Sequence, residues 1–422
     1  MVVNEQMNTN SVQAVVGALG DCRPHHAVAS GGFGGKRWVM TLVSVATLVL
    51  LGACGGGGGG DDAASTGTLP PTTTTPSTPA TTDPVSVTPP EVAPTVPEPV
   101  APPPAPPVAT VAPDLVTSVS APTYAAGTAA KGAWDRLLAQ RSACGFGLLE
   151  QDTRLDTAAY GHAHYMVQGS LDRNVHVAGH GEDSAKAYFV GETPNDRAIA
   201  AGFTEGVTEI FARAYAFYQT GQKPLLADDE AAGAKYMQLL IESVYHAMGA
   251  FKEGRSVGVA SRIGSVPSPT SKGYDYQSFA LVALVGKDAN SQKLGSGTVA
   301  SWPCAGVTVV GEFYPATESP NPFADVTSTA TAYGTPLYFK VDAGSVLVLS
   351  SVGLTKTSGG ASSTLTLREI NKTNDRWSLV QNNEVFFVPT TKLDKASTYT
   401  VNAVGTVDGV VFTRNFSFGT LP

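Results

Sequence analysis

The chain has 422 residues, of which only 15% are charged, and a formal net charge of −8. Sixteen of its 29 prolines lie between residues 61 and 113, in a stretch that holds no lysine or arginine. An acidic chain without a basic stripe cannot neutralise a run of phosphates, so the composition excludes a nucleic-acid-binding protein. The clustering of proline also excludes a single compact domain that includes every residue.

A short apolar segment near the N-terminus is typical of a secretory signal. Lys36 and Arg37 precede an apolar run from Trp38 to Leu51, which is shorter than the roughly 20 residues that a membrane-spanning helix needs. The run ends in Leu-Gly-Ala-Cys at residues 51–54, which resembles a bacterial lipobox. We therefore expect residues 1–53 to be a leader and lipoprotein signal peptide, with Cys54 as the lipidated residue. The alternative is an ordinary signal peptide with a chance cysteine.

The residues after Cys54 predict a flexible anchor. Gly55 to Gly60 form a glycine run that is typical of a solvated tether. Gly55 is not an inner-membrane retention residue of the aspartate type, so the resemblance to Gram-negative lipoproteins implies the outer membrane or the cell surface. The leader before Lys36 is unusually long, which is consistent with a translation start further along the chain.

Residues 54–113 are predicted to be a tether, first rich in glycine and then in proline and threonine. Such a composition cannot bury a core, and its prolines favour an extended chain of about 3.1 Å per residue. The stretch is therefore predicted to be a stalk that holds the rest of the protein on the order of 150 Å from the membrane. The alternative is a proline-rich ligand for a partner domain.

The remaining chain changes character near Pro303, so we expect one domain at 114–304 and another at 305–422. The second domain is predicted to be an all-β sandwich of immunoglobulin size, with Asp408-Gly409 as a hairpin turn. Residues 397–418 resemble the closing hairpin of bacterial Ig-like domains, and no site chemistry is expected there. The predicted strands are Val307–Phe313, Pro336–Val341, Val346–Ser351, Ser363–Leu367, Glu384–Val388, Ser397–Val404 and Val410–Phe418.

Apolar spacing predicts the first helices of residues 114–304. The first helix buries a face that contains Trp134 and Leu137, and the second buries a face that contains His162. His162 is therefore expected in the core, whereas His164 faces elsewhere. A third, short helix is expected between a Thr193 cap and Gly202.

A fourth and longer helix is predicted from Asp228 to Ala250. Glu242 and His246 lie four residues apart, opposite its apolar stripe. This side of the helix is either a solvated face or the lining of a cleft. Strands are expected at Ser256–Ile263 and Gln277–Val285, so helices and a small sheet together predict an α/β sandwich.

The order of motifs resembles the CAP superfamily, named for cysteine-rich secretory proteins, antigen 5 and pathogenesis-related 1 proteins. The motifs are AAYGHAHYM, GHGED, GETPNDRAIAAGF, TEIF and IESVYHAMGAF, followed by SVGVA. The resemblance is to the bacterial SCP-like branch and covers about Ala130 to Val285. It implies an α-β-α sandwich with a central cavity that presents two histidines and one or two glutamates. The whole chain is then of the α+β class, with an Ig-like sandwich after the CAP-like domain.

The resemblance implies four cavity residues. His180 and Glu182 come from GHGED, Glu209 from TEIF and His246 from SVYH. Two departures from the family pattern are Ile210 directly after Glu209, where an asparagine is usual, and Ala247 in place of the arginine that commonly follows the second histidine. His176, in the same loop as His180, competes with it for the first position.

Two imidazoles and two carboxylates that converge on a cleft support three kinds of role. They can bind a divalent metal such as zinc, with His180 and His246 as ligands and open coordination positions. They can act as general acid and base, or they can form a hydrogen-bonded network that only orders the cavity. No HExxH, GxSxG or phosphate-loop motif is present.

We therefore expect a cell-envelope lipoprotein whose cavity binds a ligand or a divalent metal without an assigned activity. Its partners would be the membrane, through the lipid, and an unidentified small ligand or an envelope or extracellular protein, but not a nucleic acid. One alternative is a hydrolase of envelope or extracellular substrates that uses the His/Glu cluster. A second alternative is a structural surface protein whose Ig-like module makes the contacts.

Two cysteines remain once Cys22 in the leader and the lipid site Cys54 are set aside. Export to an oxidising compartment allows a disulfide between Cys144 and Cys304. This bond would join the end of the first helix to the exit of the CAP-like domain. Two free thiols are the alternative.

Overall fold

The computed structural model describes residues 48–53, 111–172, 179–268, 270–287, 289–358 and 361–422. Most of the predicted tether (54–113), the predicted lipid site Cys54 and the competing His176 lie outside the described residues. Residues 111–422 belong to one compact unit. In the part of the chain that is described, no helix is both long and apolar enough to cross a membrane.

The first part of the chain forms a five-stranded sheet in the order β1-β3-β5-β4-β2. All neighbours are antiparallel except β2 and β4. The predicted strands at Ser256–Ile263 and Gln277–Val285 lie within β4 and β5 and are confirmed. The bounds are β1 Leu48–Ala53, β2 Glu150–Gln151, β3 Val207–Gln219, β4 Ser256–Pro267 and β5 Tyr274–Gly286.

Strand β1 comes from the end of the predicted signal segment. Its backbone pairs with β3, from Leu48 opposite Tyr215 to Ala53 opposite Ile210, so it forms the outer edge of the sheet. Export and cleavage before Cys54 stay predictions.

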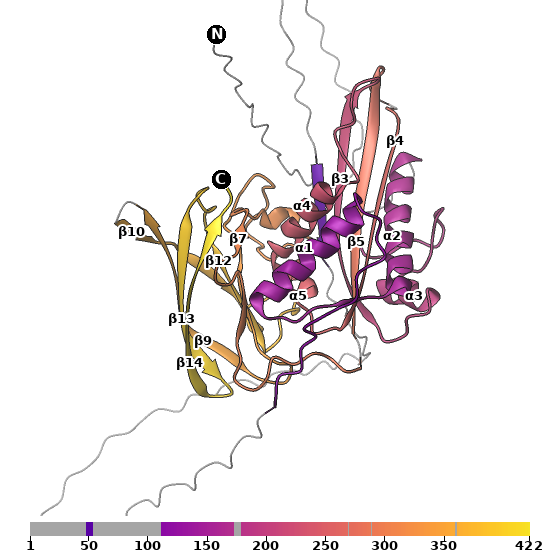
Figure 1. The fold of residues 1–422 in the computed structure, drawn as a ribbon. Helices are drawn as coiled ribbons and strands as arrows, with labels where there is room; N and C mark the ends of the chain where they lie inside the picture. Colours follow the sequence, from indigo (N-terminus) through magenta and orange to yellow (C-terminus); the bar gives the residue numbers. More distant parts are fainter. Residues whose placement is uncertain (1–47, 54–110, 173–178, 269, 288, 359–360) are drawn as a thin grey trace, which may run out of the picture. The chain divides into compact units, whose positions relative to one another are not determined.

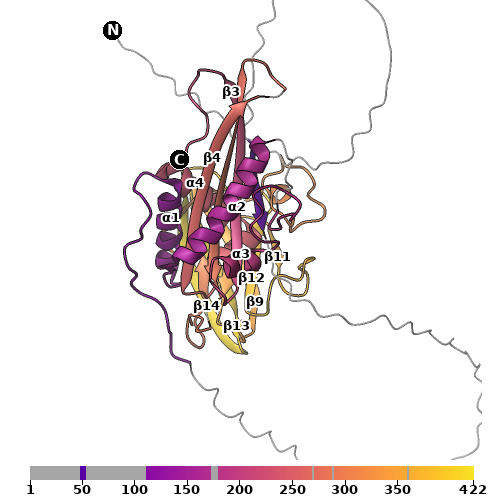
Figure 2. The ribbon, with the colours of Figure 1, turned by 90° about the vertical axis from the view of Figure 1, so that its right-hand side faces the viewer.

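Helices cover both faces of this sheet (Figure 1). Neighbouring residues of β3 point to opposite sides: Ile210 packs in the core cluster with α1, α4 and α5, whereas Phe211 packs with α2 and α3. Figure 2 views the molecule from the α2 side. The arrangement is a three-layer α-β-α sandwich within a mixed α+β protein. The helices are α1 Ala129–Cys144, α2 Thr153–Leu171, α3 Pro194–Ala200, α4 Glu230–Ile241 and α5 Val244–Ala250.

The short helix α3 begins and ends as its sequence predicts. The Thr193 side chain accepts a hydrogen bond from the backbone of Asp196, and the Asp196 side chain accepts one from the backbone of Thr193. This reciprocal pair is a capping box, and Pro194 occupies the first turn. Gly202 follows the helix with a φ of 91°. The capping box fixes the first turn of α3 and therefore the direction in which the later side chains of this helix point.

The predicted helix from Asp228 to Ala250 is wrong in its middle, because the chain breaks into α4 and α5 at Glu242 and Ser243. The Glu242 and His246 side chains are 1% and 0% exposed, so the expectation of a solvated face is also wrong. Glu242 instead accepts hydrogen bonds from the backbone of Val310 and Gly311. The break places the end of α4 and the start of α5 against the C-terminal part of the chain.

Helices α1 and α4 approach each other through a reciprocal pair of glycines. A Cβ added to Gly132 of α1 would lie 2.0 Å from the carbonyl oxygen of Glu230, and one added to Gly233 of α4 would lie 1.9 Å from that of Ala129. Each glycine therefore lets the backbone of the other helix come into direct contact.

The C-terminal part forms two sheets, in the orders β10-β9-β13-β14-β7 and β11-β12-β8-β6. Buried residues of both sheets belong to one hydrophobic cluster. The predicted strand Ser363–Leu367 is wrong, because the chain leaves β10 there and begins β11. The strands are β6 Ala300–Trp302, β7 Thr308–Val309, β8 Leu337–Lys340, β9 Leu347–Ser358, β10 Ala361–Thr364, β11 Leu367–Ile370, β12 Glu384–Pro389, β13 Thr398–Val407 and β14 Val410–Thr420.

The predicted hairpin at Asp408-Gly409 joins β13 to β14. Val407 pairs with Val410, and the two turn residues have positive φ angles of 51° and 82°. Two left-handed residues between antiparallel strands are the pattern of a type I′ turn, which matches the twist of the strands.

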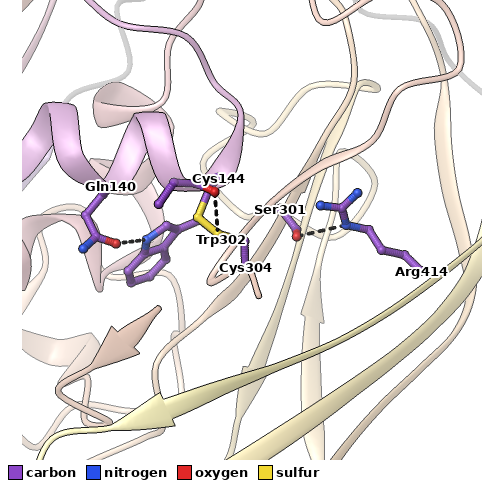
Figure 3. The surroundings of a disulfide bond; sticks show 7 residues. Gln140, Cys144, Ser301, Trp302, Cys304 and Arg414 are labelled. Carbon is purple, nitrogen blue, oxygen red and sulfur yellow. Dashed lines mark hydrogen bonds between the residues drawn. A yellow bond between two sulfur atoms is a disulfide. The ribbon is translucent and has the colours of Figure 1, made fainter. Parts of the chain in front are cut away.

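The two parts of the chain share one core. Strand β6, which precedes the predicted boundary at 304/305, pairs with β8 of the C-terminal part. The predicted disulfide between Cys144 and Cys304 is confirmed (Figure 3). Beside it, Trp302 donates a hydrogen bond of 3.0 Å to the Gln140 side chain. Helix α1 is therefore tied to the start of the C-terminal part by both a covalent bond and a hydrogen bond.

Candidate functional site

The candidate site is built around a fully buried arginine of α3. The Arg197 guanidinium donates to both carboxylate oxygens of Glu209 on β3, at 3.0 and 2.8 Å. It also donates to the carbonyl oxygens of Gly191 and His180, at 3.1 and 2.9 Å. Since an unpaired buried charge is costly, the Arg197–Glu209 ion pair and the hydrogen bonds to these carbonyls must form together. They fix the loop that carries His180 against the sheet.

Glu209 orients the His180 ring. The His180 Nδ1 atom lies 2.9 Å from Glu209 Oε1. Burial by itself raises the pKa of Glu209, but the positive charges of His162 and Arg197 and the hydrogen bond from His180 outweigh it and lower this pKa to about 2. Glu209 is therefore an ionised acceptor at neutral pH, and Nδ1 of His180 carries the proton that it donates. In the neutral ring the lone pair is then on Nε2.

The Nε2 atom of His180 is buried and has no hydrogen-bond partner among the described residues. Burial lowers the pKa of His180, and the positive charges of His246 and His162 lower it further, although Glu209 partly offsets them. The ring is accordingly neutral at physiological pH. A neutral imidazole with a free Nε2 lone pair is suited to bind a metal ion or to accept a proton.

His162 is buried, as its helical position predicts, and both ring nitrogens face acceptors. Nδ1 lies 2.9 Å from Glu182 Oε1, and Nε2 lies 3.0 Å from the carbonyl oxygen of Gly179. A carbonyl can only accept, so Nε2 donates a hydrogen bond to Gly179. His162 therefore joins helix α2 to the loop at Gly179 and at Glu182.

Glu182 braces the loop rather than pairing with His180. Its second oxygen accepts a hydrogen bond of 2.7 Å from the backbone of Val190, and its first oxygen faces His162 and, at 3.6 Å, Arg197. It therefore joins the candidate site through His162 and Arg197.

A glutamate of the C-terminal part of the chain contacts the ring of His246. Its Nδ1 atom lies 3.0 Å from Oε1 of Glu318, and both side chains are buried. The Ser243 hydroxyl lies 2.7 Å from the same nitrogen and donates its own proton to the carbonyl oxygen of Leu240 at 2.9 Å. The positive charge of His246 lowers the pKa of His180, so the two imidazoles interact electrostatically.

Of the four residues implied by the family resemblance, His180 and Glu209 are in direct contact, whereas Glu182 and His246 join through others. Sequence reasoning missed Arg197 and Glu318. Arg197 lies in the TPNDRA segment that carried part of the resemblance. Its position as a basic residue inside this motif is the feature that could have identified it as a site residue. Glu318 lies 72 residues beyond His246, and no local pattern marks it.

The donors that remain for a metal ion are imidazole nitrogens. The carboxylates of Glu182 and Glu209 are already engaged by Arg197 and by histidine N–H groups. Within the described ranges, no group of three or more His, Cys, Asp or Glu side chains is placed to hold a metal ion. The orphaned Nε2 of His180 is a donor of the kind that binds a divalent transition metal.

These features define a mixed α+β protein with a buried His/Glu/Arg network between a sheet and its covering loop. No protein-family model matches the sequence, and no curated protein matches it either.

Proposed function

We propose that this chain is an envelope lipoprotein whose α/β part binds a divalent transition-metal ion such as zinc through His180 and His246. The observation that carries the proposal is the buried Nε2 atom of His180, which has no partner in the described part of the chain. A buried polar atom without a partner costs free energy. A bound ion would remove that cost.

The family assignment belongs to the same proposal. A sheet between helical layers, with Glu209 on β3 against His180 and with His246 on α5, supports a CAP-like domain of the SCP-like branch. Two sheets with a shared core support an Ig-like sandwich in the C-terminal part.

The surrounding residues prepare the two imidazoles for a ligand. Glu209 holds Nδ1–H of His180, and such a carboxylate partner raises the basicity of the opposite nitrogen. Arg197 holds Glu209 in place at 2.8 Å. A bound ion would supply a Lewis-acidic centre with positions open to an external ligand.

The proposed anchor is the lipidated Cys54, followed by the tether to residue 113, and the proposed location is the outer membrane or the cell surface. Support comes from the apolar run and the Leu-Gly-Ala-Cys segment at residues 51–54. Mass spectrometry of the N-terminal peptide tests this anchor. The expected result is a diacylated or triacylated cysteine at residue 54, with Cys54→Ser shifting the protein to the soluble fraction. An unprocessed N-terminus in the membrane fraction would contradict it.

Metal analysis tests the proposed function. The full mature chain, purified without chelators or an affinity tag, is expected to carry or take up stoichiometric zinc on dialysis. His180→Ala and His246→Ala should each abolish it, whereas His164→Ala, two residues from the network histidine, should leave it unchanged. Absence of zinc from the wild-type protein after dialysis, or retention by both site variants, would overturn the proposal.

A further inference from the structure

We propose that the outer edge of β3 accepts an extended apolar segment of a partner protein once the leader is removed. This inference rests on the proposed cleavage before Cys54, but not on the proposed metal. Strand β1 ends at Ala53, so cleavage there removes the whole strand. The β3 residues that β1 covers, from Ile210 to Tyr215, then lie at the edge of the sheet.

Strand β1 shows what kind of segment fits this edge. It runs antiparallel to β3 over six residues, starting with Leu48 opposite Tyr215. Its sequence, LVLLGA, contains neither a charged residue nor a proline. Its last two residues, a glycine and an alanine, pair with Phe211 and Ile210. The matching segment of a partner is therefore extended, uncharged and apolar, with small residues at its C-terminal end.

The sequence of β3 does not protect this edge against pairing. Natural sheet edges usually carry lysine, proline or a bulge that prevents another chain from adding a strand. The segment from Ile210 to Tyr215 has no proline, and β3 pairs with β5 from Val207 to Gln219 without a register shift. Its one charged residue, Arg213, is 9% exposed and donates a hydrogen bond of 2.8 Å to Ser170 of α2. This charge is therefore engaged with α2 and does not guard the edge.

The rest of the molecule already holds this edge in the strand conformation. Strand β5 pairs with the other side of β3 along its whole length. Ile210 and Ala212 pack in the core cluster on one face of the sheet, and Phe211 packs in the cluster on the other face. A partner segment would therefore gain main-chain hydrogen bonds to a strand that loses little conformational freedom on binding. Ile210 directly follows Glu209, so the partner would reach the strand that carries the candidate site.

The probe for this edge is a fluorescently labelled peptide with the sequence of residues 48–53 and a polyethylene glycol tag for solubility. It is added to the processed mature chain and, as a control, to the intact chain with Cys54→Ala, which lacks the lipobox cysteine and keeps β1. Two readouts are made: fluorescence anisotropy for the affinity of the peptide, and hydrogen exchange of the backbone amides of residues 210–215.

The mature chain is expected to bind the peptide, with slowed exchange at residues 210–215. The intact chain should bind it at least about 10-fold more weakly, because β1 competes from within the same molecule. A peptide with Leu50→Pro/Leu51→Pro should also lose about 10-fold or more in affinity. Neighbouring N–H groups of a strand point to opposite sides, so one of the two faces β3, and its loss leaves a carbonyl without a donor.

Two lysine variants of β3 provide a matched pair. Tyr215 and Phe217 both contact the ring of Tyr276, at 6.1 and 5.2 Å between ring centroids, but only Tyr215 lies in the segment that β1 covers. Tyr215→Lys should weaken peptide binding by about 2- to 5-fold, since it replaces an apolar cross-strand pair, whereas Phe217→Lys should bind like the wild type. The proline peptide needs no change in the protein, so it decides the question if either lysine variant fails to fold.

Absence of peptide binding by the mature chain, or equal binding of the proline peptide, would overturn the inference. Slow exchange at residues 210–215 in the mature chain alone that disappears on dilution would also overturn it, since a second copy would then occupy the edge. A further result separates this inference from the proposed anchor. If N-terminal mapping finds the leader uncleaved, the anchor fails. Peptide binding by the intact Leu50→Pro/Leu51→Pro chain, but not by the intact wild type, then supports β3 as a strand acceptor, and binding by neither overturns it.

Discussion

At the scale of single residues, His162 is a side chain that the network holds on both sides of its ring. Both of its ring nitrogens lie about 3 Å from oxygen atoms of Glu182 and Gly179, and it is fully buried. Its charge also helps to keep Glu209 ionised. Its loss would leave a buried carboxylate and a buried carbonyl without their donor.

We expect His162→Leu to lower the free energy of unfolding by about 3–5 kcal/mol, since it breaks a buried ion pair by removing one partner. The matched control is His164→Leu on the same helix, whose ring makes aromatic contacts with Tyr160 and Tyr188. It should cost about 1 kcal/mol. Urea unfolding at neutral pH measures the free energy of unfolding of both variants. Equal losses for His162→Leu and His164→Leu would contradict the charged network.

The sequence predicted part of this network. Helical spacing placed His162 in the core, and the family resemblance placed His180 and Glu209 among the residues of one cavity, where these two are in contact. It could not predict that Glu182 faces His162, because loop residues have no periodicity that fixes their direction. It could not predict Glu318 either, because the contact depends on how a distant segment packs.

At the scale of secondary structure, α4 and α5 show where periodicity misleads. The apolar stripe continues from one helix into the next, so the pattern predicts one helix. The break is set by the buried carboxylate of Glu242, which accepts from Val310, Gly311, Thr335 and Gln238. Burial raises the pKa of this carboxyl, although these hydrogen bonds partly offset it. Partners from distant loop segments, such as Val310 and Thr335, cannot be seen in a helical pattern.

The crossing of α1 and α4 gives a prediction at this scale. Gly132→Ala and Gly233→Ala should each destabilise the protein by about 1–3 kcal/mol, since the new methyl group meets backbone that must shift. Gly161→Ala on α2 is the control, because its nearest neighbour is a Val190 side chain at 3.1 Å. It should stay within about 1 kcal/mol of the wild type. Thermal unfolding compares the stability of the three variants, and an equal loss of stability in all three would contradict the close contact between α1 and α4.

At the scale of the whole described unit, the α/β and β parts are joined by buried charge as well as by apolar packing. Lys340 of β8 is 2% exposed and lies 2.8 Å from Glu253 and 3.3 Å from Glu384. Burial raises the pKa of Glu253, but Lys340 and Lys252 outweigh it and lower this pKa to about 2. The ionised pair therefore stabilises the contact between the two parts.

This pair predicts a pH dependence. A carboxyl whose pKa falls from 4.5 to about 2 on folding stabilises the protein above pH 4.5 and loses that contribution as the pH falls toward 2. The wild type should exceed Glu253→Gln in stability by about 3 kcal/mol at neutral pH. The difference should shrink steadily below pH 4.5. A difference that is constant between neutral and acidic pH would contradict the assignment.

The disulfide makes a second prediction for the whole unit. Cys144 and Cys304 are 160 residues apart. Closing such a loop lowers the conformational entropy of the unfolded chain, which stabilises the folded protein by about 5 kcal/mol in the chain-entropy model. The Cys144→Ser/Cys304→Ser double variant should therefore unfold at lower urea, and reductant should affect only the wild type. Non-reducing peptide mapping that finds both thiols free would contradict the bond.

The central claim is that His180 and His246 together bind a divalent metal ion. The most direct measurement is anomalous diffraction at the zinc edge, from crystals of the tag-free chain equilibrated with zinc. The account predicts a peak about 2.0–2.1 Å from Nε2 of each histidine. A well-ordered site with no anomalous density near these two atoms, or zinc bound only elsewhere, would contradict it.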